Sequence, residues 1–343
     1  MKRTLISAGF LITGAMAFTA TLAAQSSARS SAPGADPKTP WIQPGYKAPR
    51  TPWGNPDFQG VWADASNVPL QRDAKLGDRT LFTKEEFAVR NAPRPPVNGP
   101  NSDKVEGTPA DVHYDLSQFG LSKGETVDDM RTSLITSPAN GRIPPVLAAA
   151  AKRTQARNAE RQAHATDSTE YRGLAERCIL WNNEGPPITP QGYNPNLQIV
   201  QSKDSVAITI EMIHDTRIID MNRKTHLPET VRQWFGDSIG HWEGDTLVVD
   251  TTNFTDKTAF QGSGTKLHVI ERFRRTSPSD MEYSFTVEDP DTWDQPWSAT
   301  IPWPKADANV LYEYACHEGN YGMPNILSGF RADEAKKAAA AKK

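Results

Sequence analysis

Cysteine and net positive charge are both scarce in this sequence. Its 343 residues include only 2 Cys, and 38 Lys and Arg stand against 41 Asp and Glu, which gives a formal net charge of −3. Two cysteines are too few for a disulfide-dense scaffold or for a zinc site with four Cys ligands. Without a basic excess the chain lacks the electrostatic footprint of a nucleic-acid-binding protein, and we predict no nucleic-acid partner.

The motifs of common cofactors and metals are also missing. The chain contains no G-x-G-x-x-G and no P-loop, and it lacks the parallel βαβ pattern that these motifs need. Its 7 His residues form no H-E-x-x-H or H-x-H spacing. We therefore predict no nucleotide cofactor and no metal. A metal site that brings His214, His241 and Asp237 together in space is the alternative.

Long apolar runs are absent except at the start of the chain. Lys2 and Arg3 precede an uncharged stretch at 5–22, which is rich in Ala, Gly and Thr and is followed by small residues. This pattern is typical of a secretory signal peptide, here residues 1–24. A retained membrane anchor is the alternative. We predict a periplasmic or secreted protein with no membrane span after cleavage.

Export would place the two cysteines in an oxidising compartment. In an oxidising compartment an even pair of cysteines is expected to be joined, so we predict a disulfide between Cys178 and Cys316. The alternative is a nucleophilic cysteine that His317 assists. Because adjacent residues on a strand point to opposite faces, Cys316 and His317 would not meet, and the disulfide is favoured.

Composition divides the remaining chain into segments. The predicted organisation is a Pro- and Ser-rich arm at 25–56, a single β domain at 57–330 with an irregular, partly helical insertion at about 64–170, and a low-complexity, solvated tail at 331–343. In the arm, Trp41 and Trp53 are candidate anchors to the domain.

Two helices are expected within the insertion. The first is 83–91, where Thr83 is placed as the N-cap and Glu86 completes a capping box. The second is 144–163, which two prolines open, and its polar far side predicts that it lies outside any core.

Short runs rich in β-branched and aromatic residues dominate the second half of the chain and alternate with turn signals. The runs are 57–63, 196–202, 205–212, 216–221, 238–244, 246–254, 267–275, 281–289, 297–303 and 310–317. Joins of hairpin length at 202–204 and 243–245 predict a meander of consecutive antiparallel strands. So many strands bury well only as a closed barrel or a two-sheet sandwich, and closure also removes exposed edges, so a barrel is favoured.

Alternation along the strands assigns their faces. In 267–275 the apolar face carries Leu267, Val269 and Phe273, but it also carries an acid, Glu271. An acid that faces a barrel interior has to be paired or hydrogen-bonded, because burying it alone is costly.

The densest polar constellation lies at 211–217 and 237–250 and predicts a site at one mouth of the barrel. A His beside a carboxylate serves as general acid or base near neutral pH, and an Arg holds an anionic group. The predicted catalytic residues are Glu211, His214, Asp237 and His241, and the predicted substrate-binding residues are Tyr193, Arg217, Trp234, Trp242 and Glu271. The alternative, with equal weight, is that HWEGD is only a strand, a tight turn and a strand. His226 is interpreted as a surface-loop residue.

Abundant Trp and Tyr predict an aromatic or hydrophobic small-molecule ligand if some of them line a cavity, although core packing is the commoner use. Three functions remain open. The first is an enzyme that acts by acid–base chemistry as a lyase, isomerase or hydrolase. The others are a ligand carrier without turnover, and a structural or interaction protein.

Two resemblances add to these predictions. Gly60-Val61-Trp62 within DFQGVW is similar to the G-x-W motif on the first strand of lipocalins, which implies a lipocalin-like (calycin-type) barrel. Longer segments, among them WGNPDFQGVW, EMIHDTRIIDM, GDSIGHWEGDTLVVDTTNF and YEYACHEGNYG, resemble a family of exported bacterial hypothetical proteins. This second resemblance implies export and a common fold, and it brings no activity with it.

Overall fold

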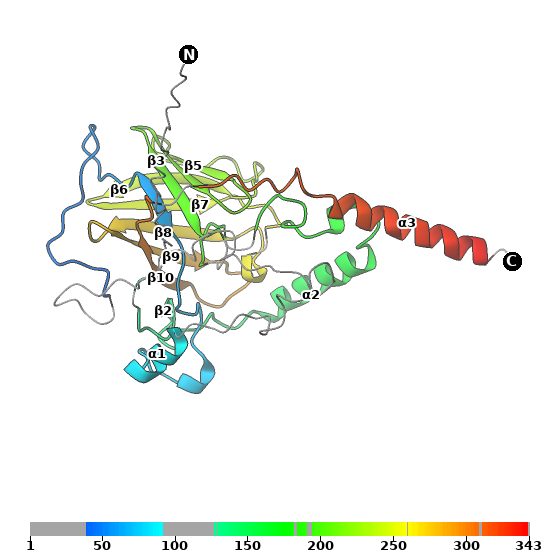
Figure 1. Ribbon diagram of the computed structural model, residues 1–343, viewed down its shortest axis with the longest axis horizontal. Helices are drawn as coiled ribbons and strands as arrows, with labels where there is room; N and C mark the ends of the chain where they lie inside the picture. Colours follow the sequence, from blue (N-terminus) through cyan, green and yellow to red (C-terminus); the bar gives the residue numbers. More distant parts are fainter. Residues whose placement is uncertain are drawn as a thin grey trace, which may run out of the picture.

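One large β-sheet organises the computed structural model of this protein, which describes residues 39–91, 127, 129–181, 184–190, 194–258, 260–308 and 311–341. Ten strands pair in the order β1-β3-β4-β5-β6-β7-β8-β9-β10-β2 (Figure 1). The expected mainly β class is therefore confirmed. The predicted signal peptide and most of the 92–128 segment lie outside the described residues.

The elements follow the chain in a simple order. The strands are β1 (Gly60–Ala63), β2 (Ile135–Ser137), β3 (Asn196–Gln201), β4 (Ser205–Ile210), β5 (Thr216–Asp220), β6 (Asp237–Glu243), β7 (Thr246–Thr252), β8 (His268–Arg275), β9 (Asp280–Glu288) and β10 (Trp297–Pro304). The helices are α1 (Lys84–Asn91), α2 (Ala148–Ala163) and α3 (Gly322–Ala340), with short 3-10 turns at Ala74–Leu76, Thr169–Tyr171 and Phe260–Gly262.

The sheet is a curled half-barrel whose first and last long strands approach each other. Trp62 on β1 forms a bridge with Lys305, which follows β10, and the Ala306 N–H donates to the Val61 carbonyl at 2.8 Å. The right-handed twist of neighbouring strands gives a large sheet this curl. The sheet is thus a half-barrel and not the fully closed barrel that was favoured, and the side chains on its concave face are buried.

The concave face holds the core, and the predicted alternation is confirmed on β8 and β9. Val269, Glu271 and Phe273 are buried on β8, and every second residue of β9 from Met281 to Val287 is buried as well. Trp303 stacks on Tyr283 with ring centroids 4.3 Å apart. Many of the Trp, Tyr and Phe side chains therefore pack in the core.

The expected uninterrupted antiparallel meander is wrong at one point. β5 and β6 run parallel and share a single residue pair, Asp220 with Ile239, whereas the neighbouring strands are antiparallel. The connection at 221–236 carries the chain back along the sheet, so that β6 starts in the direction of β5. The sheet is consequently weakest between these two strands.

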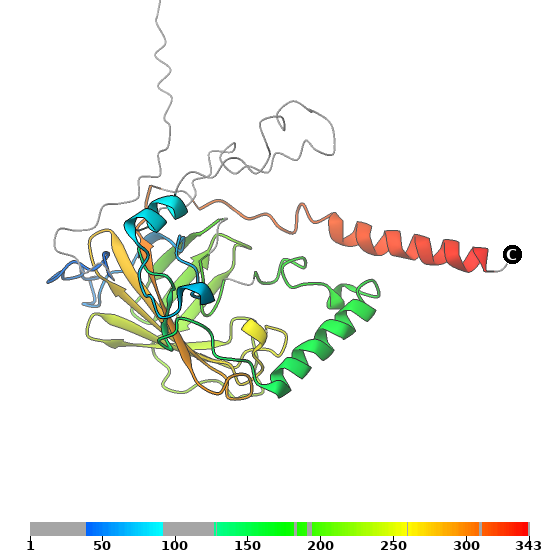
Figure 2. The ribbon, with the colours of Figure 1, turned by 90° about the horizontal axis from the view of Figure 1, so that it is seen from below.

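Two C-terminal predictions also need correction. Residues 311–317 form turns and coil, not the expected strand at 310–317. Residues 331–340 continue helix α3 and are exposed, so the predicted low-complexity tail is solvated but helical. Ala and Lys have high helix propensities, which favours a helix here, and Arg331 Nη2 also donates to the Asp167 carbonyl at 2.7 Å. Figures 1 and 2 show α2 and α3 extending from the sheet on the same side.

The arm and the insertion follow their predicted local rules. Trp41 is buried, and its indole N–H donates to Glu282 at 3.1 Å, so it anchors the arm. At α1 the capping box is confirmed, because Thr83 N–H donates to Glu86 at 2.8 Å and Glu86 N–H donates to the Thr83 hydroxyl at 3.2 Å. Helix α2 begins at Ala148 and not at the expected position 144, so the two prolines precede the helix and do not open it; only Ala150 is buried.

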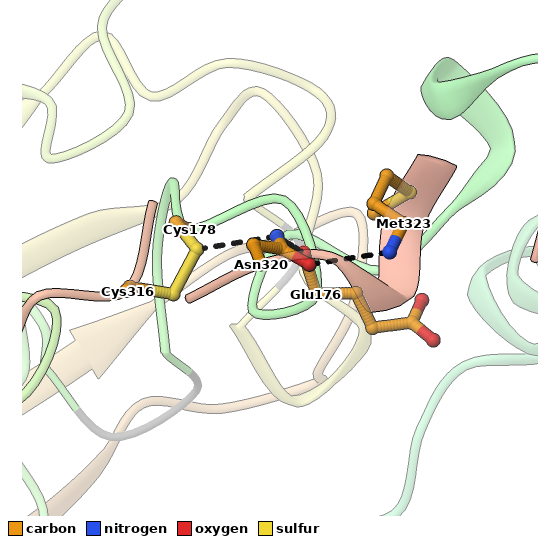
Figure 3. Close-up of a disulfide and its surroundings, with 5 residues drawn as sticks. All are labelled: Glu176, Cys178, Cys316, Asn320 and Met323. Carbon is orange, nitrogen blue, oxygen red and sulfur yellow. Dashed lines mark hydrogen bonds between the residues drawn. A yellow bond between two sulfur atoms is a disulfide. The ribbon is translucent and has the colours of Figure 1, made fainter. Parts of the chain in front are cut away.

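The predicted disulfide is confirmed. Cys178 and Cys316 are joined with their Cα atoms 5.8 Å apart and a sequence separation of 138 residues (Figure 3). Beside it, the Asn320 amide donates to the Glu176 carbonyl at 2.8 Å and to Cys178 Sγ at 3.5 Å. The disulfide thus ties the segment before β3 to the segment after β10.

Candidate functional site

A cleft of about 800 Å³ opens beside the weak pairing of β5 and β6, and we name it the β5–β6 cleft. Its walls come from β5, from the 221–236 connection and from the start of β6. The lining residues are Asp215, Thr216, Arg217, Ile218, Asp220, Arg223, Leu227, Arg232, Gln233, Trp234, Phe235, Gly236, Asp237, Ser238 and Thr255. The predicted site residues Arg217, Trp234 and Asp237 therefore share one cleft.

Arg217 joins the cleft to the core through a buried ion pair. Its Nη1 and Nη2 donate to the two Glu271 carboxylate oxygens at 2.5 Å and 3.0 Å, and the Tyr283 hydroxyl donates to the same carboxylate at 2.8 Å. Burial works to lower the pKa of Arg217, but the charge of Glu271 outweighs it and raises that pKa. The expected partner for the acid on the apolar face is thus a permanently charged arginine.

Asp237 anchors the second wall of the cleft. Its carboxylate accepts hydrogen bonds from the Arg223 guanidinium at 2.8 Å and 3.0 Å and from the Leu227 N–H at 2.9 Å, and it lies 3.0 Å from His226 Nδ1. Burial works to raise the pKa of Asp237, but these donors, led by Arg223, hold it below its ordinary value. Such contacts fasten the 221–236 connection to β6.

A chain of imidazoles and carboxylates runs from this anchor across the convex face of the sheet. His226 Nε2 and His268 Nε2 lie 3.0 Å and 2.9 Å from the same Asp250 oxygen, and His268 Nδ1 lies 3.3 Å from Glu288. Alternation along β7, β8 and β9 would have placed Asp250, His268 and Glu288 on one face. The contact of His226 with two carboxylates depends on the path of its connection, so the surface-loop interpretation missed it.

Because His268 lies beside two carboxylates, we expect the stability of the protein to depend on pH. The hydrogen bond to Asp250, aided by that carboxylate's charge and by Glu288, raises the pKa of His268 above its ordinary value. Because the folded-state pKa is the higher one, this stabilisation is complete below about pH 6.5 and is lost as pH rises through the folded-state pKa. We expect His268→Gln to flatten the fall in the free energy of unfolding between pH 6 and pH 9, as measured by urea denaturation.

The control for this measurement is His317→Gln, which removes an exposed imidazole that has no side-chain partner among the described residues. It should leave the slope of stability against pH unchanged. An equally steep slope in wild type and His268→Gln would contradict the assignment.

Neither predicted catalytic histidine reaches the β5–β6 cleft. His214 is exposed in the turn between β4 and β5, where its backbone φ is +63°. His241 is exposed beside the β6–β7 hairpin, with Nε2 3.3 Å from Glu243. The turn at Gly244 follows the alternative interpretation of HWEGD, in which a φ of +60° suits glycine. The structure therefore separates these histidines from Asp237.

Two other predicted site residues, Glu211 and Trp242, make their contacts away from the β5–β6 cleft. Glu211 is buried and accepts a hydrogen bond from the Asn196 amide at 2.7 Å. Trp242 packs against Phe58 with ring centroids 5.3 Å apart. Tyr193 lies outside the described residues. None of these three therefore adds a known contact to the cleft.

Sequence patterns also missed two buried carboxyls, Asp64 and Glu184, which are each 1% exposed. Burial raises the pKa of Glu184 to about 8 and that of Asp64 well above its ordinary value. The Trp181 N–H donates to Glu184 at 2.9 Å. Asp64 directly follows β1 and Glu184 lies in an irregular segment, so no periodic signal marks either acid. The pKa of about 8 indicates that Glu184 is mainly protonated near neutral pH.

Within the described part of the chain, no group of three or more His, Cys, Asp or Glu side chains is placed to hold a metal ion. The helices that the structure describes include none long and apolar enough to cross a membrane. Comparison with models of known families, with curated proteins and with solved structures gives no match. The resemblances to lipocalins and to an exported family therefore stay expectations.

Proposed function

We propose that this protein binds a small molecule in the β5–β6 cleft, one that carries an anionic group and a flat apolar part. Arg232 carries the proposal. Among the described residues its guanidinium donates only to the Phe254 and Thr265 carbonyls, through Nη1 at 3.0 Å each, whereas Arg217 and Arg223 have carboxylate partners. Carbonyls position a guanidinium without cancelling its charge. No described residue accepts a hydrogen bond from its other N–H groups, so these can donate to a carboxylate ligand.

The apolar side of the cleft supports the expected aromatic ligand. Leu227, Trp234 and Phe235 line it together with Arg232. A flat ring stacks on an indole while a charged substituent pairs with a nearby guanidinium. This arrangement favours the ligand-carrier function, with the curled half-barrel as a lipocalin-like scaffold whose ligand enters between two strands.

A carrier of this type fits export. The Cys178–Cys316 disulfide is the kind of crosslink that forms in the periplasm or outside the cell. We propose that the protein works there.

Arg232→Gln is expected to weaken binding of 2-naphthoate by about 10-fold to 100-fold, because a hydrogen bond to a charged group contributes about 1.5–3 kcal/mol. Isothermal titration calorimetry measures the affinity. Lys224→Gln removes an exposed charge from the same connection, outside the cleft lining, and should bind like wild type. Equal affinity of Arg232→Gln and wild type would overturn the proposed site, as would equal affinity of wild type for the neutral 2-naphthalenemethanol.

An acid–base enzyme is the second candidate, and Asp215 favours it. This side chain lines the cleft, and burial raises its pKa. Its only donor within the described chain is the Thr216 N–H at 2.8 Å, so one oxygen is available for proton transfer. Turnover of a cleft ligand that Asp215→Asn abolishes, with binding retained, would favour this enzyme over the carrier.

A further inference from the structure

A second cleft, of about 610 Å³, lies between helix α2, the segments at 173–181 and 185–186, and the turn around Phe260, and we name it the α2 cleft. The inner face of α2 presents Ala150, Arg153, Thr154, Arg157 and Arg161, whose spacing of three or four residues places them in one stripe. An inward stripe on a surface helix is normally apolar, so arginines in this position call for a specific reason.

The first and last arginines of the stripe have partners in the body of the protein. Arg153 Nη2 donates to the Thr292 hydroxyl at 2.9 Å and to the Gly262 carbonyl at 3.3 Å. Arg161 Nε donates to the Tyr171 carbonyl at 3.4 Å. The middle arginine, Arg157, lines the cleft and is half-buried, yet it has no hydrogen-bond or ion-pair partner among the described residues.

The one acid in the lining does not neutralise Arg157. Glu176 forms an ion pair with Arg172 at 2.6 Å and accepts the Gly173 N–H at 2.7 Å. Although burial works against it, these partners, together with the charge of Arg161, hold the pKa of Glu176 below its ordinary value. Glu176 is thus already paired, and no other described side chain compensates the charge of Arg157.

Apolar side chains form part of the lining beside polar ones that include Thr258 and Gln261, and they favour an anion with an apolar body. Leu174, Leu180, Trp181, Pro186 and Phe260 provide them, while Thr154 and Asn158 add polar groups beside Arg157. We propose that the α2 cleft is a second ligand site, which binds an organic carboxylate with an apolar body through a charge-assisted pair with Arg157. A guanidinium presents parallel N–H groups that match a carboxylate, and the apolar walls take the body of the ligand.

The wall opposite α2 is held in place before a ligand arrives. Cys178 lies in this wall and is joined to Cys316, and Asn320 donates to the Glu176 carbonyl beside it (Figure 3). A site whose walls are already fixed loses less conformational entropy on binding. The disulfide is thus part of the proposed site as a support.

Calorimetric titration with decanoate tests the proposal on the intact protein. Arg157→Gln should weaken binding at least 10-fold, whereas Lys152→Gln, which removes the same charge from an exposed position of α2, should bind like wild type. The neutral 1-decanol should bind wild type and Arg157→Gln equally. Inorganic phosphate should not displace decanoate, because it lacks the apolar body. Unchanged thermal unfolding of Arg157→Gln establishes that the helix is intact.

Three results would overturn the proposal. They are no binding of decanoate by wild type at millimolar concentration, equal binding by Arg157→Gln, and displacement of decanoate by phosphate. Arg232→Gln separates the two clefts: it should leave decanoate affinity unchanged, and a loss there would move the ligand to the β5–β6 cleft. The α2 cleft does not depend on the proposed function, since each arginine variant reports on its own cleft.

Discussion

Replacing Glu271 by Gln is expected to lower the free energy of unfolding by about 3–5 kcal/mol. The Arg217 guanidinium would then be buried beside a neutral amide, because both side chains of the present pair lie almost entirely away from water. Removing one member of a buried ion pair leaves the other charge without compensation for its lost hydration. Urea denaturation followed by tryptophan fluorescence measures the change.

A second variant shows whether the lone charge causes the loss. Arg217→Met combined with Glu271→Gln removes both charges and leaves an amide oxygen to accept the Tyr283 hydroxyl, so it should recover most of the stability. Glu243→Gln breaks the exposed pair with Arg272 and should leave stability nearly unchanged. Full stability of Glu271→Gln would contradict the proposed energetics of this pair.

Replacing both Cys178 and Cys316 by Ser is expected to lower the free energy of unfolding by up to about 5 kcal/mol. The estimate follows from the sequence separation of 138 residues, because closing so long a loop removes much of the unfolded chain's entropy. Guanidinium denaturation of wild type and of the double variant gives the difference.

The variant should also show where the constraint acts. Loss of the crosslink frees the coil at 311–321, which then relies on contacts such as Asn320 with Glu176, so protease cleavage should increase there first. Reduction of wild type should reproduce the effect, while the same reductant should not change the variant. A variant as stable as the oxidised wild type would show that the crosslink adds nothing.

Local patterns predicted the features that depend on neighbours in sequence. Nine of the ten expected runs contain a strand, because alternation of apolar and polar residues survives in any half-buried sheet. The capping box at Thr83 formed for the same local reason. The tenth run, at 310–317, has the composition of a strand, but its described residues pair with no neighbouring strand, and composition alone does not supply a partner.

It was harder to predict which of the candidate site residues lie close together in space. The closeness of His214 and His241 to Asp237 along the chain suggested a common site, but a turn and a hairpin hold these imidazoles at the surface. His226 contacts Asp237 because the 221–236 connection folds back over β6. Alternation assigns a face to a residue on a strand and says nothing about the path of a connection.

The sequence by itself determined the β class, the faces of β8 and β9, the need for a partner at Glu271 and the pairing of Cys178 with Cys316. The first three follow from periodic patterns of apolar and polar residues. The disulfide follows from the cysteine count, since a chain with 2 Cys can form only one intramolecular pair. Only the tertiary structure decided which strands run parallel, where the sheet opens, and which arginines lack a carboxylate partner. Those features depend on strand direction and loop paths, which arise from contacts between residues far apart in the chain.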